Sequence, residues 1–107
     1  MSTVAYIQDE QEFDTLLANE KVFVVDCTAT WCGPCRVVAP LMDRLAADYP
    51  EQIKVLKLDL EDNRPLALRF NIKSIPAIMF FKDGKLVETL IGVKPYETFT
   101  EAVDKLL

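Results

Sequence analysis

The sequence predicts an α/β domain in which a mixed sheet carries helices on both of its faces. In its first part, short β-branched segments alternate with longer segments of helical periodicity, an order typical of right-handed parallel crossovers. Later, an Asp-Gly pair at 83–84 separates two apolar runs and predicts an antiparallel hairpin. The predicted element order is therefore βαβαβαββα.

The first predicted elements are a short strand, a helix and a central strand. Val4 to Ile7 is a short apolar stretch, and Asp9 with Glu12 three residues later resembles a capping box that begins a helix. The apolar face of this helix consists of Phe13, Leu16 and Leu17. Val22 to Cys27 is apolar on both alternating faces except at Asp26, as expected for a strand buried on both sides.

A long amphipathic helix and a further strand are predicted next. Pro34 suits a first helical turn, and Pro50 ends the helical pattern. Apolar side chains recur between them at helical spacing, at Val38, Leu41, Met42, Leu45 and Tyr49. Ile53 to Leu60 returns to strand character, and Asp62 or Asn63 is placed to cap a short helix.

The last predicted elements are the hairpin and a closing helix. The Asp-Gly turn is predicted to connect a strand over Ile78 to Phe81, the end of the apolar run that begins at Ile75, with a strand over Leu86 to Ile91. Pro95 begins a helix whose apolar face consists of Phe99, Val103 and Leu106. Because the chain contains no repeat, low-complexity tract or linker, we expect residues 1–107 to form a single domain.

Composition and charge narrow the classes of protein to consider. Half of the residues are apolar and 27% are charged, which indicates an ordered globular chain. The formal charge of −5 and the lack of a basic cluster argue against nucleic-acid binding, and the apolar runs fall short of the roughly 20 residues of a membrane span. The first residues lack the features of a secretory signal. We expect a cytoplasmic monomer, or one in an organelle lumen if a targeting peptide was removed.

The strongest indication of reactive chemistry comes from the three cysteines, in a chain that contains no histidine. Cys32 and Cys35 have the spacing that lets two thiols at a helix start close a small ring and reopen it by exchange. The first turn of a helix has free amide donors and the positive end of the helix dipole, and both favour a thiolate. Cys32 is therefore the predicted nucleophile, and Cys35, one turn inward and less exposed, is the predicted resolving thiol.

Other interpretations of these residues stay open at this point. Cys-x-x-Cys is also half of a zinc site, but a closed site needs two more ligands, and only Cys27 and carboxylates are left to supply them. Cys32 and Cys35 can also be two buried thiols without a redox role. Cys27 lies in an apolar strand and is interpreted as a small core residue rather than a third redox centre. Trp31 is either a core residue or, as its place beside Cys32 favours, part of a binding surface that shields the thiol.

Asp26 is an anomaly because a carboxylate inside an apolar strand is costly to bury. Burial is expected to raise its pKa, so that it can exchange a proton with Cys35 as a general acid and base. The alternative is an aspartate that faces solvent at the strand end. Lys57 interrupts the next strand in the same way, and it either pairs with Asp26 or extends to solvent from its apolar stem.

The most specific motif is Trp31-Cys32-Gly33-Pro34-Cys35. Other positions accompany it in a fixed order: Asp26, Pro40, Lys57, Ile75-Pro76, the Asp83-Gly84 turn and Gly92. With this set the chain resembles the thioredoxin family along nearly its whole length. The resemblance implies a thioredoxin fold, in which a five-stranded mixed central sheet is flanked by four helices.

The resemblance also implies roles for individual residues. The Ile75–Pro76 bond is expected to be cis and to place the Ile75 backbone beside the disulfide, where it pairs with an extended substrate chain. Asp26 becomes the buried proton-transfer residue and Lys57 its neighbour. The implied docking rim consists of Trp31, Gly33, Pro34, Ile75, Pro76, Gly92 and Val93.

Five positions depart from the usual pattern of the family. Cys27 and Thr28 stand where members often carry aromatic residues, and Arg36 stands where Lys is common. Ser74 replaces a frequent Gly, and Val93 replaces the usual Ala. None of these removes a group that exchange needs, but together they leave partner preference open, and Cys27 leaves additional oxidation chemistry open.

The function that the resemblance implies is that of a protein-disulfide reductase, a thiol–disulfide oxidoreductase that acts as a dithiol electron carrier. Reduced Cys32 attacks a target disulfide, and Cys35 resolves the mixed disulfide. A separate thioredoxin reductase, either an NADPH-flavin or a ferredoxin-dependent one, restores the dithiol. No cofactor or metal is expected besides the Cys32–Cys35 disulfide. A scaffold that binds partners through the rim, and a metal-binding domain, are the competing hypotheses.

Overall fold

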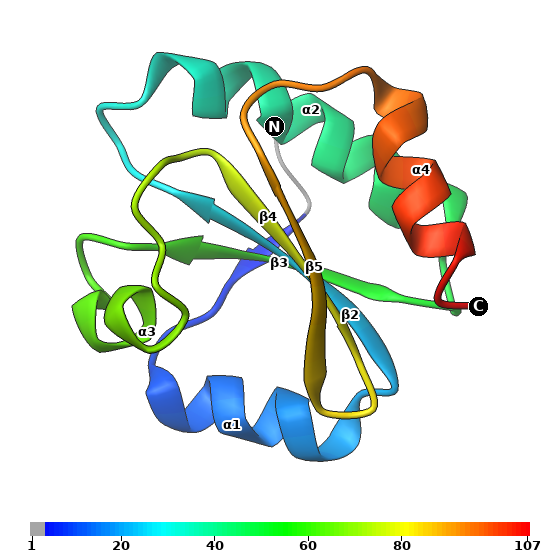
Figure 1. Cartoon of the computed structure of the whole chain (residues 1–107), viewed down its shortest axis with the longest axis horizontal. Helices are drawn as coiled ribbons and strands as arrows, with labels where there is room; N and C mark the ends of the chain where they lie inside the picture. Colours follow the sequence, from blue (N-terminus) through cyan, green and yellow to red (C-terminus); the bar gives the residue numbers. More distant parts are fainter. Residues whose placement is uncertain (1–3) are drawn as a thin grey trace.

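Five strands form one mixed sheet with the order β1-β3-β2-β4-β5 in the computed structural model, which describes residues 4–107 (Figure 1). The strands are β1 (Ala5–Tyr6), β2 (Val22–Thr28), β3 (Lys54–Asp59), β4 (Ala77–Lys82) and β5 (Lys85–Ile91). The helices are α1 (Glu10–Asn19), α2 (Gly33–Asp48), α3 (Arg64–Arg69) and α4 (Tyr96–Asp104). The predicted element order and the mixed sheet are confirmed.

Strand β2 occupies the middle of the sheet. It pairs in parallel with β3 and antiparallel with β4, while β1 adds to β3 in parallel and β5 adds to β4 antiparallel. Because β2 has a neighbour on each side and a helical layer over each face, residues 22–27 are all buried. The chain leaves β2 at Thr28 and enters α2 at Gly33, so the Cys-x-x-Cys segment follows the end of a rigid central strand.

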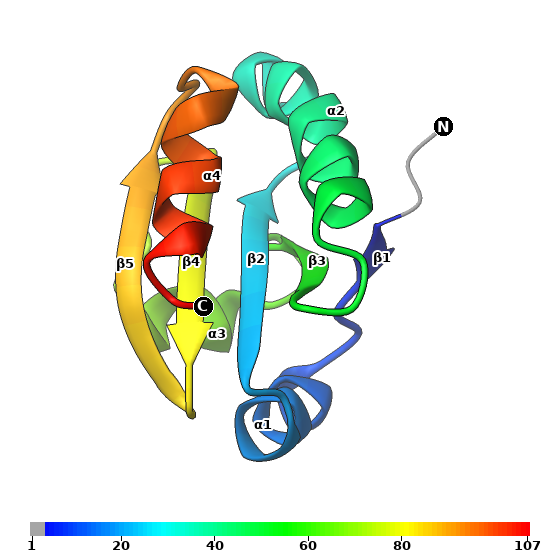
Figure 2. The same ribbon diagram turned by 90° about the vertical axis from the view of Figure 1, so that its right-hand side faces the viewer.

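The helices cover the two faces in pairs. Figure 2 shows α2 and α4 side by side over one face of the sheet, with α3 behind the strands. Val22 and Val24 pack in the core beneath α2 and α4, whereas Phe23, Val25 and Cys27 pack in the core beneath α1 and α3. This alternation follows from the period of two along a strand, and it assigns odd and even positions of β2 to different sides of the molecule.

An aromatic cluster holds α1 and the end of α3 against the sheet. The rings of Phe23 and Phe81 stack with centroids 4.6 Å apart, and Phe13 from α1 meets both rings edge-on at 6.0 and 5.5 Å. Phe70 closes the cluster, 5.1 Å from Phe13 and 5.6 Å from Phe81. Phe13, Phe23 and Phe81 are fully buried, so the cluster contributes both apolar burial and edge-to-face attraction.

Local signals at the element ends are mostly confirmed. Asp9 Oδ1 accepts a hydrogen bond from the Glu12 amide at 2.8 Å, and the Glu12 carboxylate accepts the Gln8 amide at 2.6 Å. Asp83 and Gly84 have φ of 51° and 78°, as the predicted Asp-Gly turn requires.

Two element starts differ in detail from the prediction. Asn63 is the N-cap residue of α3, as one of the two predicted candidates, but its side chain donates to the Asp59 carbonyl at 3.1 Å and makes no cap bond. Strand β4 begins at Ala77, one residue before the expected Ile78, and the preceding Pro76 has no amide hydrogen to donate to a strand ladder. No helix in the described part of the chain is long and apolar enough to cross a bilayer.

We predict that Phe81→Ala lowers the free energy of unfolding by about 3 to 5 kcal/mol, because it leaves a cavity among three other rings. Urea denaturation measures the change, with Leu107→Ala as the control. Leu107 is 54% exposed, so its removal is expected to cost less than about 0.5 kcal/mol. A loss below about 1 kcal/mol for Phe81→Ala would contradict the stabilising role assigned to the cluster.

Candidate active site

The two cysteines of the motif lie at the start of α2 and form a disulfide. Their Cα atoms are 5.3 Å apart, and Cys32 is the N-cap residue of the helix, with Pro34 in the first turn. The Cys35 amide donates a hydrogen bond to Cys32 Sγ at 3.2 Å. When the disulfide is reduced, this donor and the positive end of the α2 dipole favour a thiolate at Cys32.

Both cysteines are buried almost equally, so the expected lower exposure of Cys35 amounts to a very small difference. Cys32 is 4% exposed and Cys35 is 3% exposed. The difference between them is one of position, because Cys32 occupies the cap and accepts the Cys35 amide. The position at the helix terminus therefore favours Cys32 as the nucleophile, and the first turn of the helix places the Cys35 sulfur beside it.

Asp26 and Lys57 are brought together by strand register. Asp26 on β2 is directly paired with Lys57 on β3, and both positions share the α2 face of the sheet with Val24 and Val55. Asp26 is 1% exposed, so the alternative in which it faces solvent is wrong, and Lys57 is 7% exposed, so most of the lysine is buried. The predicted proximity is confirmed, although the two residues are 31 positions apart in the sequence.

Burial raises the pKa of Asp26 from its ordinary value of 3.8 to about 7, and the positive charge of Lys57 partly offsets the rise. Asp26 Oδ1 is enclosed and has no hydrogen-bond partner among residues 4–107. A carboxyl group in this state gains or loses a proton near neutral pH. It can therefore serve as an acid in one step and as a base in another.

A cavity of about 290 Å³ connects this carboxyl group to the disulfide. Asp26, Cys35 and Lys57 all line it, and its lining also includes Tyr6 and Arg36. The volume is enough for several water molecules, which can carry a proton between the carboxyl group and Cys35. Tyr6 was not identified from the sequence. It approaches because β1 pairs with β3 at Lys57, and its ring centroid lies 5.6 Å from Lys57 Nζ.

Cys27 lies on the opposite face from Asp26 and is fully buried in the core beneath α1 and α3. Burial raises its pKa well above the usual range for a thiol, and the neighbouring Asp26 carboxylate raises it further. These surroundings fit the small core residue predicted from the strand, because a thiolate is disfavoured there. Among the described residues no group of three or more His, Cys, Asp or Glu side chains is arranged to hold a metal ion.

The residues expected to form the docking rim lie around the disulfide. Trp31 is 69% exposed, and Gly33, Pro34 and Val93 are exposed as well. Ile75 packs against Ala29, Cys32 and Cys35, and the Ile75–Pro76 peptide bond is cis, as the resemblance implied.

A hydrogen bond joins the two loops of this rim. The Gly92 amide donates to the Pro76 carbonyl at 2.8 Å, and this places Val93 near the cis bond. Gly92 has φ of 88°, a conformation that strongly favours glycine. The rim is thus built from three chain segments that meet at the end of β2.

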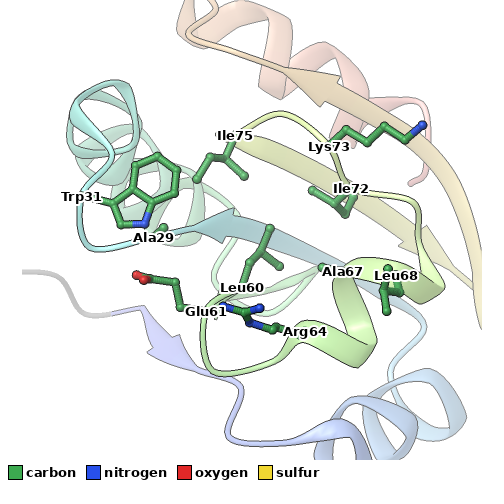
Figure 3. A pocket seen from close by; sticks show the side chains of 10 residues that line it. All are labelled: Ala29, Trp31, Leu60, Glu61, Arg64, Ala67, Leu68, Ile72, Lys73 and Ile75. Atoms are coloured by element: carbon green, nitrogen blue, oxygen red, sulfur yellow. The ribbon is translucent and has the colours of Figure 1, made fainter.

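A second hollow adjoins the rim on the side of α3, and it was not predicted. Figure 3 shows the Trp31 indole on one side, side chains of α3 on the other, and Leu60 between them. We call this the α3 pocket; its volume is about 420 Å³ and its apolar lining includes Ala29, Trp31, Leu60, Leu68, Ile72 and Ile75. Its charged lining consists of Glu61, Arg64 and Lys73. No sequence signal marks the pocket, since apolar residues of a short helix are usually core residues.

Comparisons with known proteins agree with this geometry. The family model described as thioredoxin matches residues 4–105. The chain is 40% identical to thioredoxin 1 of Synechococcus elongatus over 107 residues, covering all of both chains, and 41% identical to thioredoxin of Staphylococcus aureus over 92% of this chain and 93% of that one. Among solved structures, a thioredoxin of Plasmodium falciparum aligns with a TM-score of 0.88 at 27% identity, covering 95% of this chain and 98% of that one.

We predict that Asp26→Asn stabilises the fold by about 2 to 4 kcal/mol at pH 8.5 and by much less at pH 3.5. Below its unfolded pKa of 3.8, the Asp26 carboxyl group is neutral and its burial does not lower the stability of the fold. This stability is lost as the pH rises through the folded pKa of about 7, because burial disfavours the carboxylate. The asparagine amide stays neutral at every pH. Urea titrations of both proteins at the two pH values measure the difference, and an equal gain at both pH values would exclude a titrating buried carboxyl group.

Proposed function

Because the chain belongs to the thioredoxin family and is a thiol–disulfide oxidoreductase, we propose that it reduces protein disulfides, with Cys32 as the attacking thiolate and Cys35 as the resolving thiol. The observation that carries this assignment is the position of Cys32 at the N-cap of α2, where its sulfur accepts the Cys35 amide. The family works with its redox-active disulfide and needs no cofactor.

In the first step, the Cys32 thiolate attacks one sulfur of the target disulfide. A new sulfur–sulfur bond forms between Cys32 and the target, the target bond breaks, and the leaving thiolate takes up a proton. Access to Cys32 requires the target chain to approach the exposed rim. The exposed Trp31 supplies a large apolar contact there, and the backbone of Ile75 offers hydrogen-bonding groups to an extended segment.

In the second step, Cys35 attacks Cys32 and releases the reduced target. The Cys35 thiol must lose a proton first, and we assign the Asp26 carboxylate as the base that receives it through the cavity that both residues line. The pKa of about 7 fits this task, because the group is then partly deprotonated at neutral pH and can hold a proton. Lys57 supports the charged form of Asp26.

The partners follow from the same chemistry. Members of this family act on disulfide-containing targets and are returned to the dithiol state by a reductase. For this chain we propose an NADPH-flavin or a ferredoxin-dependent thioredoxin reductase as the electron source. We further propose that residues 1–107 work as one monomeric domain in electron transport, in the cytoplasm or in a reducing organelle lumen. The free, buried Cys27 thiol fits a reducing compartment.

We predict that Cys32→Ser abolishes dithiothreitol-driven reduction of insulin disulfides, measured as precipitation of the released chains. The serine hydroxyl cannot form the mixed disulfide, so the rate should fall to that of dithiothreitol alone. Cys27→Ser is the matched control: its sulfur lies on the opposite face, so the activity of the folded protein should be retained. If Cys32→Ser retained full activity, the exchange mechanism would be wrong, and a scaffold role of the rim would take its place.

We predict that Asp26→Asn slows reduction at pH 7 by about tenfold or more, as expected when a general base is removed. The wild-type rate should show an inflection near pH 7, and the variant should lose it. Fluorescence of Trp31, the only tryptophan, follows the redox state of the adjacent Cys32 in stopped-flow measurements. Asp62→Asn, an exposed position, is the control, and identical pH profiles for Asp26→Asn and wild type would contradict the proton-transfer role.

A further inference from the structure

Tyr6 borders two hollows, of which the mechanism uses only one. Strand β1 forms the edge of the sheet beside β3, and its register pairs Tyr6 with Lys57 (Figure 2). Tyr6 lines the cavity of about 290 Å³ that also contains Asp26, which we call the Asp26 cavity. It also lines a hollow of about 410 Å³ whose lining includes Asp59 and Asp62. Tyr6 is therefore part of the wall between a buried carboxyl group and two carboxylates nearer the surface.

The Lys57 ammonium lies over the Tyr6 ring. Lys57 is 7% exposed, and its Nζ is 5.6 Å from the ring centroid. Among residues 4–107 this ammonium makes no hydrogen bond and has no carboxylate within ion-pair distance. The face of an aromatic ring attracts a cation through its quadrupole, and the attraction is stronger where water is partly excluded. The ring therefore stabilises an ammonium that burial disfavours.

The ring of Tyr6, rather than its hydroxyl group, makes this contact. In the described part of the chain the hydroxyl has no hydrogen bond, and only the backbone carbonyl of Tyr6 accepts one, from the Gln8 side chain at 3.4 Å. Tyr6 is 48% exposed and belongs to neither of the two large core clusters that cover the faces of the sheet. Apolar packing therefore does not explain the aromatic side chain at this position, whereas the contact with Lys57 does.

Lys57 carries the charge through which Tyr6 can influence Asp26. The other titratable and charged groups of the Asp26 cavity come from β1, β3 and α2, and they are Tyr6, Lys57, Cys35 and Arg36. Arg36 is exposed, and its guanidinium donates to the Thr30 carbonyl at 3.2 Å. On the β4 side, Asp26 is paired with the apolar Ile78. Lys57 lowers the pKa of Asp26, so the position of the ammonium determines how strongly the carboxylate is supported.

We propose that Tyr6 is a positioning residue whose ring holds the Lys57 ammonium on the Asp26 side of the wall, away from Asp59 and Asp62. In this position the ammonium supports the charged form of Asp26. Without the ring, water and the two outer carboxylates attract the ammonium outward, and Asp26 loses part of this support. The proposal rests on the proton-transfer role assigned to Asp26 above, and it adds a residue that acts through Lys57.

Titration of Asp26 in the oxidised protein tests the proposal, because Cys32 and Cys35 do not titrate in the disulfide. NMR of the Asp26 carboxyl carbon follows this titration independently of activity. We expect Tyr6→Leu to raise the pKa of Asp26 by about half a pH unit, because leucine keeps much of the bulk but has no aromatic face. Tyr6→Phe is the matched control: it keeps the face and removes only the hydroxyl, so the pKa should stay unchanged.

A double-mutant cycle shows whether Tyr6 acts through Lys57. Lys57→Met removes the ammonium and keeps a similar stem, so it should raise the pKa of Asp26 at least as far as Tyr6→Leu does. Adding Tyr6→Leu to Lys57→Met should then cause no further shift. An equal shift in both backgrounds would overturn the proposal. So would a lower pKa in Tyr6→Leu, because the ring would then serve to keep water away from Asp26.

The pH profile of insulin reduction separates this proposal from the function on which it rests. If Tyr6→Leu moves the NMR titration and the inflection of the rate together, both conclusions hold. If the titration moves as expected but the wild-type rate has no inflection near pH 7, the role of Tyr6 stands and the proton-transfer role of Asp26 falls. If the inflection is present but neither measurement responds to Tyr6→Leu, proton transfer by Asp26 stands and the proposal for Tyr6 is wrong.

Discussion

The pairing of β2 with β3 and β4 is the constraint on which the rest of the structure depends. Because the strand is central, its odd and even residues are committed to different layers of the molecule. Cys27 enters the core beneath α1 and α3, whereas Asp26 enters the layer beneath α2 and meets Lys57 across the strand pair. A slip of one residue in this register would exchange the two faces, burying the cysteine near the disulfide and removing the carboxyl group from it.

Two residues of the redox site, the buried Asp26 and the N-cap residue Cys32, are unfavourable choices for the stability of the fold. Asp26 reduces stability above its pKa, because its charged form is held in a poorly hydrated environment. Cys32 replaces the usual oxygen-bearing N-cap side chain with a sulfur that accepts only one weak amide bond. Both arrangements are explained by the chemistry they permit, namely a proton that moves near pH 7 and a thiolate at the start of a helix.

The surface around the disulfide is assembled from segments that are distant in sequence. The loop before α2 supplies Trp31, the loop before β4 supplies Ile75, and the loop after β5 supplies Gly92. The hydrogen bond from Gly92 to Pro76 fixes two of these loops together, and α3 borders the pocket beside Trp31 (Figure 3). Loops of this kind can vary between relatives while the sheet beneath them keeps the sulfur atoms in place, which separates target choice from the exchange reaction.

The sequence by itself determined the fold class, the element order, the hairpin at Asp83-Gly84 and the reactive pair Cys32 and Cys35, because these follow from periodicity, turn chemistry and spacing within short segments. It also singled out Asp26, although whether this residue faced the core or solvent was left open. Only the tertiary structure decided that question, together with the register of Lys57, the approach of Tyr6 and the existence of the α3 pocket. Each of these depends on contacts between elements that are far apart in the chain, and no local pattern of residues encodes such distances.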